Sequence, residues 1–163
     1  MKVICITGAP GTGKTTLSKN LAKMLNFLYL DVNKLISKHK LFEGYDKKRK
    51  TKIVDAGNLA RFLIRKIKSY KNQSLKGIII DSHLSHYIPK NHVDLCIVAK
   101  CDIKELGRRL KTRGYSEIKI KENIQAEIFD ICREEALERR HKILVIDSAK
   151  KIGYGRLSSR LLK

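Results

Sequence analysis

The chain has 163 residues, of which 42% are hydrophobic and 32% carry a charge, a balance typical of a globular protein and not of a disordered one. This length predicts one domain, residues 1–163, with a core of its own. No apolar run approaches the roughly 20 residues that a membrane-spanning helix needs, so we expect no membrane partner. The first apolar run begins at residue 2, and we also expect no signal peptide.

The net charge of +20 arises from 36 Lys and Arg residues against 16 Asp and Glu residues. So large an excess predicts polyanionic partners, because a nucleotide accounts for only a few of the charges. RNA is one such partner, since its binding depends on lysines and arginines that neutralise phosphates. Adaptation to a salty or hot cytoplasm also produces lysine-rich surfaces. Both explanations stay open, and no RNA-stacking motif is visible in the sequence.

Four cysteines, at positions 5, 96, 101 and 132, show no metal-ligand spacing. Cys5 and Cys96 fall inside strand-like runs, where reduced cysteines serve as small core residues. Reduced cysteines predict a cytoplasmic location.

Residues 8–15, GAPGTGKT, fit the phosphate-binding pattern G-x-x-x-x-G-K-[ST] without a mismatch. Residues 2–7 before the pattern have the composition of a buried strand, and residues 14–25 after it repeat leucine at helical spacing. A strand that leads through a glycine loop into a helix presents main-chain N–H groups to phosphate oxygens. The pattern predicts a nucleoside triphosphate site, with Lys14 on the β- and γ-phosphates and the Thr15 hydroxyl on Mg²⁺.

The apolar run of residues 27–31 indicates a second buried strand, which ends at the carboxylate of Asp31. Ligands of open α/β sheets lie at the carboxyl ends of the strands, which would place Asp31 in the active cleft. Asp31 also fits the N-cap of a following helix, residues 32–38. The two roles are compatible.

Residues 32–75 are the most basic part of the chain, with 13 Lys or Arg residues against 3 Asp or Glu residues. We predict helices over residues 32–38 and about 55–70, separated by a turn-like break at residues 42–46. Nucleotide kinases hold their phosphoryl acceptor in a helical insertion of this kind. The basic run of residues 47–50 could steer an anionic substrate or simply form a solvated face.

A third strand, residues 76–81, ends at Asp81 and is followed by Ser82 and His83. An apolar strand that ends in aspartate, paired with a phosphate loop, is the Walker B arrangement. Asp81 is therefore predicted to hold Mg²⁺ beside Thr15, directly or through water. His83 emerges on the same side, where it could orient a water or an acceptor phosphate, or be structural.

After a fourth strand, residues 93–99, Asp102 is predicted to cap a helix that directs Leu106 and Leu110 inward and its two arginines, Arg108 and Arg109, outward.

Gly114 ends that helix, and a long helix is predicted over roughly 116–140. Arginines at such a helix–helix turn suit a lid that closes over the transferring phosphoryl group. Arg113 is the first candidate and Arg109 the second, the alternative being surface arginines of a basic protein.

A fifth strand, residues 143–147, is followed by a loop, residues 148–150, that is placed to cover an adenine base, and by a final helix from about residue 152. Five strands that alternate with helices predict an α/β fold. The expected architecture is that of nucleoside-kinase-like P-loop NTPases, a three-layer sandwich with a five-stranded parallel sheet in the order 2-3-1-4-5, a helical insertion and a short lid.

Several of these motifs together resemble the adenylate kinase isoenzyme 6 family, the archaeal and eukaryotic nuclear-type adenylate kinases that are also described as ribosome-assembly NTPases. The similarity extends from residue 3 to about residue 136. It is carried by the phosphate loop with Thr16, the turn of residues 43–46, the Asp-Ser-His of residues 81–83, and the segments 112–115 and 122–129. The last two segments are the most specific to the family.

The resemblance implies Mg²⁺-dependent phosphoryl transfer from ATP to AMP, which yields ADP, together with a slower ATP hydrolysis. By position, the implied ATP contacts are Gly11, Gly13, Lys14, Thr15, Thr16 and Arg113. The implied catalytic residues are Lys14, Asp81, His83 and Arg113, with the metal on Thr15 and Asp81.

The resemblance further implies an NMP-binding region at about residues 31–54 and a lid at about residues 112–122. The implied macromolecular partners are a small-subunit ribosomal protein and ribosomal RNA.

Two functions therefore stand beside each other. One is an AMP kinase. The other is an assembly factor for which ATP hydrolysis drives release from a ribosomal protein or RNA partner. Its kinase activity would be incidental. A kinase for another small acceptor, such as shikimate or dephospho-coenzyme A, lacks support from residues 112–129.

Overall fold

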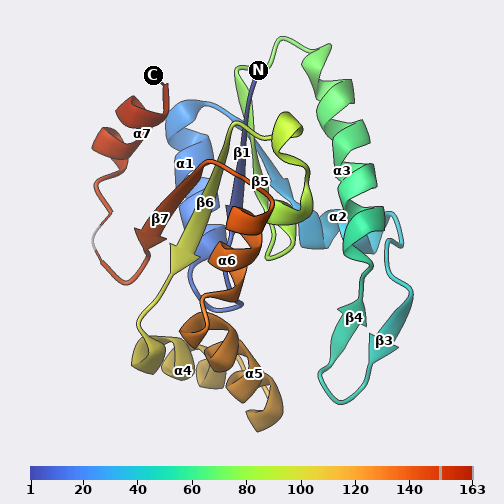
Figure 1. Ribbon diagram of the computed structural model, residues 1–163, viewed down its shortest axis with the longest axis vertical. Helices are drawn as coiled ribbons and strands as arrows, with labels where there is room; N and C mark the ends of the chain where they lie inside the picture. Colours follow the sequence, from blue (N-terminus) through green and yellow to red (C-terminus); the bar gives the residue numbers. More distant parts are fainter. Residues whose placement is uncertain (151, 163) are drawn as a thin grey trace.

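A five-stranded sheet, parallel throughout, forms the centre of the computed structural model, which describes residues 1–150 and 152–162 (Figure 1). The order β2-β5-β1-β6-β7 corresponds to the predicted order 2-3-1-4-5. All four strand pairings are parallel. The strands are β1 (Lys2–Thr7), β2 (Leu28–Asp31), β5 (Gly77–Asp81), β6 (Leu95–Lys100) and β7 (Ile143–Asp147).

Helices cover both faces of the sheet, which is why the central strands are apolar without alternation. On one face, α1 (Lys14–Leu25) and α7 (Tyr154–Leu162) pack against side chains such as Ile4 and Ile79. On the other face, the sheet residues Val3 and Ile78 pack against the remaining layer. That layer contains α2 (Val32–Lys38), α3 (Ala56–Lys71), α6 (Ile131–Glu138) and a 3-10 turn, η1 (Ser85–Tyr87). A second 3-10 turn, η2 (Lys90–His92), leads into β6.

The insertion between β2 and β5 contains an antiparallel hairpin that the sequence did not predict. Strands β3 (Gly44–Asp46) and β4 (Thr51–Ile53) pair where a turn-like break was expected. Each strand has three residues, and none of them is buried, so the hairpin leaves no hydrophobic alternation for a sequence to reveal. The basic run of residues 47–50 forms its tip. Figure 1 shows the hairpin extending past the carboxyl ends of the strands.

The long helix predicted for residues 116–140 is wrong, because the chain breaks between α5 (Glu117–Ile128) and α6. Asp130 adopts a left-handed conformation with φ of 54°, which a continuous helix excludes. The Lys100 ammonium stabilises the break, since it lies 2.7 Å from Asp130 Oδ1 and donates to the Glu127 carbonyl. Ile128 and Ile131, whose spacing in the sequence is that of one helix face, lie on either side of the break and are 59% and 42% exposed.

The two predicted helix caps, Asp31 and Asp102, are confirmed, and the structure adds a third at Ser116. The carboxylates of Asp31 and Asp102 accept from main-chain N–H groups in the first turns of α2 and α4 (Ile103–Thr112), and the Ser116 hydroxyl does so in α5.

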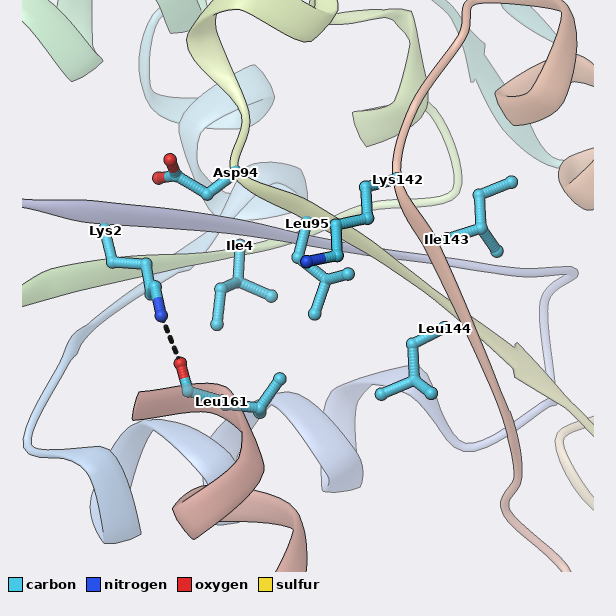
Figure 2. Close-up of a pocket in the computed structure, with 8 residues that line it drawn as sticks. All are labelled: Lys2, Ile4, Asp94, Leu95, Lys142, Ile143, Leu144 and Leu161. Carbon is cyan, nitrogen blue, oxygen red and sulfur yellow. Dashed lines mark hydrogen bonds between the residues drawn. The ribbon is translucent and has the colours of Figure 1, made fainter. Parts of the chain in front are cut away.

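The amino end of the sheet carries a cavity of about 360 Å³. Figure 2 shows the Lys2 ammonium directed at the carbonyl of Leu161 in the last turn of α7, to which it donates a hydrogen bond. This cavity lies at the opposite end of the strands from the phosphate loop, so it does not belong to the site predicted from the sequence. Among the helices of residues 1–150 and 152–162, none combines the length and apolarity that crossing a bilayer requires.

Substitution of Gly77 tests how tightly β5 packs against Phe27. A Cβ built there would lie 2.4 Å from the buried Phe27 ring, so Gly77→Ala should lower the free energy of unfolding by about 1–3 kcal/mol through overpacking. Gly155→Ala is the matched control, because its Cβ would meet nothing within 4 Å, and we expect no loss of stability. Urea denaturation measures both, and equal stability of Gly77→Ala and the wild type would contradict the packing described.

Candidate active site

The phosphate loop connects β1 to α1 in the manner that its sequence predicts. Gly13 is the N-cap residue of α1 with φ of 87° and supplies no side-chain cap. A Cβ on Gly13 would lie 2.8 Å from Ser148 Oγ, so both backbone conformation and space require glycine. The first main-chain N–H groups of α1 therefore face the loop without a side-chain acceptor, which is the geometry that binds anions.

The Ala9 carbonyl organises the interior of the loop. It accepts from Lys14 Nζ at 3.2 Å and from Thr12 Oγ1 at 2.8 Å. Burial lowers the pKa of Lys14, and the nearby Asp81 carboxylate opposes this shift. Phosphate oxygens beside the ammonium would favour its charged form in the same way.

Asp81 ends β5 beside the loop, in register with Ile6 of β1 on one side and Asp31 of β2 on the other. Its side chain is 6% exposed. The Tyr29 hydroxyl donates to Asp81 Oδ2 at 2.9 Å, and burial together with this bond raises the pKa of Tyr29. This partner was not found from the sequence, where nothing in the strand 27–31 singles out Tyr29.

The oxygen donors here fit a metal ion that arrives with a polyphosphate. Mg²⁺ usually keeps several waters and binds one or two carboxylates plus substrate phosphates. Asp81 offers a carboxylate whose Oδ2 is already in use, and Thr15 offers an exposed hydroxyl in the first turn of α1. In the part of the chain that the structure describes, no group of three or more His, Cys, Asp or Glu side chains could hold a metal. The residues present therefore suit Mg²⁺ bound jointly by protein and nucleotide.

A first cavity, of about 220 Å³, borders the phosphate loop at Gly11, Gly13 and Thr16. Its other side is lined by Arg109, Arg113, Ser148, Ile152 and Tyr154. The predicted lid arginine and the predicted base-covering loop thus lie at the same cavity as the loop glycines.

Arg109 was predicted to point outward, and this is wrong. Its Nη1 donates to the Gly11 carbonyl at 3.4 Å, and its Nε donates to Glu105 at 2.7 Å. The reason is helical geometry, because a residue three positions after the buried Leu106 shares its face. Arg108, by contrast, is 69% exposed.

A second cavity, of about 460 Å³, lies between α2, the hairpin and His83. Asn33 and Ser37 line this second cavity and also line an open depression whose other lining residues include Thr15 and Asp31. His83 is an exposed residue that lines this cavity, and desolvation of its ring followed by the charge of Lys14 lowers its pKa. His83 is therefore neutral at neutral pH.

An ion pair connects the hairpin to α5 across 73 positions of sequence. Arg49 Nη2 lies 2.6 Å from Glu122 Oε1, while Arg49 Nη1 lies 2.9 Å from Asp46 Oδ2. These contacts raise the pKa of Arg49 and lower the pKa of Glu122. One member of the basic run of residues 47–50 thus joins the hairpin to α5, which no local pattern indicated.

Comparisons with known proteins agree with this geometry. A family model described as AAA domain matches residues 4–130. An adenylate kinase isoenzyme 6 homolog from Caenorhabditis elegans is 36% identical over 135 residues, covering 83% of this chain and 72% of that protein. A Methanosarcina barkeri protein named "Putative adenylate kinase" is 38% identical over 149 residues, covering 91% and 78%. The solved structure of M. mycoides deoxyadenosine kinase with bound dATP has a TM-score of 0.57 at 17% identity, covering 100% of both chains, and supports the fold.

The Arg49–Glu122 pair predicts a measurable coupling between the hairpin and α5. Arg49→Ala and Glu122→Ala should each speed amide hydrogen exchange in β3 and β4 by about twofold to fivefold, and the double variant should add nothing further. Glu117→Ala, an exposed glutamate of the same helix, is the control and should leave exchange unchanged. Additive effects of the two substitutions would show that the pair does not couple the elements.

Proposed function

This chain belongs to the adenylate kinase isoenzyme 6 family and is a nucleotide kinase, and we propose that it transfers the γ-phosphoryl group of ATP to AMP with Mg²⁺, forming two molecules of ADP. The observation that carries this proposal is a pair of cavities, one lined by Gly11 and Gly13 of the phosphate loop and the other lined by His83 and the insertion between β2 and β5. A kinase that transfers a phosphoryl group from one nucleotide to another needs a donor site and an acceptor site that meet at one phosphate loop.

On the donor side, main-chain N–H groups of the loop, including those of Gly11 and Gly13, would hold the phosphates of ATP. Thr16 and Arg113 would be further contacts, and the base would lie near Ser148. Lys14 would neutralise charge that develops on the transferring group. Arg113 would add a second positive charge as the lid, about residues 112–122, closes and excludes water.

On the acceptor side, AMP would occupy the cavity of the region of about residues 31–54, with its phosphate toward His83. A neutral His83 can accept a hydrogen bond or donate one, so it suits an orienting role for the acceptor phosphate. Thr15 and Asp81 would hold Mg²⁺, and the bound ion would offset the negative charge of the phosphates. Positioning of the two nucleotides would be the protein's main contribution to catalysis, because phosphoryl transfer needs little covalent chemistry from the protein.

A second candidate function is ATP hydrolysis coupled to assembly of the small ribosomal subunit, with the kinase reaction incidental. The net charge of +20 favours this candidate, because two nucleotides and Mg²⁺ do not require it. Its partners would be a small-subunit ribosomal protein and ribosomal RNA, and a cytoplasmic location stays a prediction.

Lys14 provides the direct test of the phosphate site. Lys14→Ala should lower kcat for ADP formation from ATP and AMP by about 100-fold or more, as expected for loss of a preorganised positive charge, and Asp81→Ala should do likewise through the metal. Lys23→Ala, at the exposed far end of the same helix, should stay within about twofold of the wild type. Circular dichroism checks the fold of each variant, and equal turnover of Lys14→Ala and wild type would refute the assignment.

An acceptor panel separates the two functions. ADP formation that rises steeply with AMP concentration, and less with other nucleoside monophosphates, is the expected result for the kinase. ATP hydrolysis that depends on added ribosomal protein, without a response to AMP, would favour the assembly factor instead.

A further inference from the structure

A buried polar chain lies directly beneath the phosphate loop and takes no part in the function proposed above. Thr7 ends β1, His86 lies in η1 and Glu135 lies in α6. Thr7 Oγ1 is 2.7 Å from His86 Nδ1, and His86 Nε2 is 2.8 Å from Glu135 Oε2. Thr7 and His86 are 0% and 1% exposed, so water does not substitute for these contacts.

The donors and acceptors of this chain determine its proton positions. A neutral imidazole has one N–H donor and one acceptor nitrogen, whereas a carboxylate only accepts. Burial lowers the pKa of His86, which favours the neutral ring, although Glu135 opposes the shift. The nearby Arg139 guanidinium and the His141 ring also lower the pKa of His86. Nε2 then carries the proton that Glu135 accepts, and Nδ1 is left as an acceptor for the Thr7 hydroxyl.

Glu135 is itself held in place. The Tyr87 hydroxyl donates to Glu135 Oε1 at 3.0 Å, and the Arg139 guanidinium lies 3.9 Å from the centre of the Tyr87 ring. Both carboxylate oxygens therefore have a donor, which holds the carboxylate toward His86.

The Thr7 hydroxyl has one proton, with one nitrogen and one oxygen acceptor within reach, and the Cys132 thiol is a further hydrogen-bond partner of Thr7. His86 Nδ1 lies at 2.7 Å, and the His83 carbonyl lies at 3.2 Å. The tautomer of His86 decides which acceptor receives the proton, because an Nδ1–H ring would donate to Thr7 and turn its hydroxyl toward His83. Thr7 immediately precedes Gly8, so this choice acts at the point where the phosphate loop leaves the sheet.

We propose that His86 and Glu135 are positioning residues that orient the Thr7 hydroxyl and thereby hold the start of the phosphate loop against the segment that carries His83. The same segment is attached to β1 one residue earlier, where the Ser85 hydroxyl and the Ser82 N–H both lie within hydrogen-bond distance of the Ile6 carbonyl. As a contribution to phosphoryl transfer, this role rests on the proposed function.

Nuclear magnetic resonance of the histidine nitrogens tests the arrangement without any assay of activity. In the chain of residues 1–163 at pH 7, His86 should be the Nε2–H tautomer. Glu135→Gln should increase the Nδ1–H form, because a glutamine amide can donate to Nε2. Glu134→Gln is the matched control, since Glu134 is its exposed neighbour and pairs with Arg133, and the tautomer should be unchanged. An Nδ1–H ring in the wild type would overturn the proposal.

Kinetics then measure the positioning. Thr7→Val keeps the shape of Thr7 without its hydroxyl and should lower kcat about tenfold or more, the scale expected for a misplaced reacting group, whereas Thr7→Ser should restore most of the rate. Glu135→Gln should lose activity that Glu134→Gln retains. A rate for Thr7→Val equal to that for Thr7→Ser, with both variants folded, would overturn the proposal. A wild type that forms no ADP from ATP and AMP would instead refute the proposed function, and the tautomer measurement would still decide the hydrogen-bond arrangement.

Discussion

Helix α1 begins without a side-chain acceptor for its first N–H groups, and this unmet requirement organises the rest of the site. Such groups need an anion, water or another partner, and the positive end of the helix favours the anion. The sheet brings the carboxylate of Asp81 close to the phosphate loop, because β1 and β5 are adjacent and end at the same edge. Lys14 and Asp81 therefore lie close enough to influence each other.

Much of this arrangement follows from local sequence. The strands are apolar runs buried on both faces, so their positions and the α/β class could be predicted, and parallel connections leave few strand orders for a phosphate-loop protein. The phosphate loop, Asp81 and the caps Asp31 and Asp102 could also be located, because each depends on neighbours within a few residues. Arg113 and Ser148 could be predicted to lie near the phosphate loop, because Arg113 directly follows α4 and Ser148 directly follows β7.

The features that could not be predicted depend on contacts between distant residues. The break at Asp130 is stabilised by Lys100, thirty positions earlier, whereas the local isoleucine spacing favours a continuous helix. Arg49 finds Glu122 only because the hairpin and α5 extend from the same end of the sheet (Figure 1). His86 and Glu135 read as unrelated polar residues until the fold places both beneath Thr7.

The break at Asp130 also lies between two separate apolar clusters. Helices α4 and α5 share a small apolar cluster that includes Leu106, Leu110 and Ile120, whereas Ala136 of α6 belongs to the main core. The α4–α5 body is joined to the sheet by two connections, residues 101–102 and residues 129–130, so any displacement of it as one body must bend both and must break the hydrogen bond from Arg109 to the Gly11 carbonyl. Lys100 stands at both connections, because it ends β6 and pairs with Asp130.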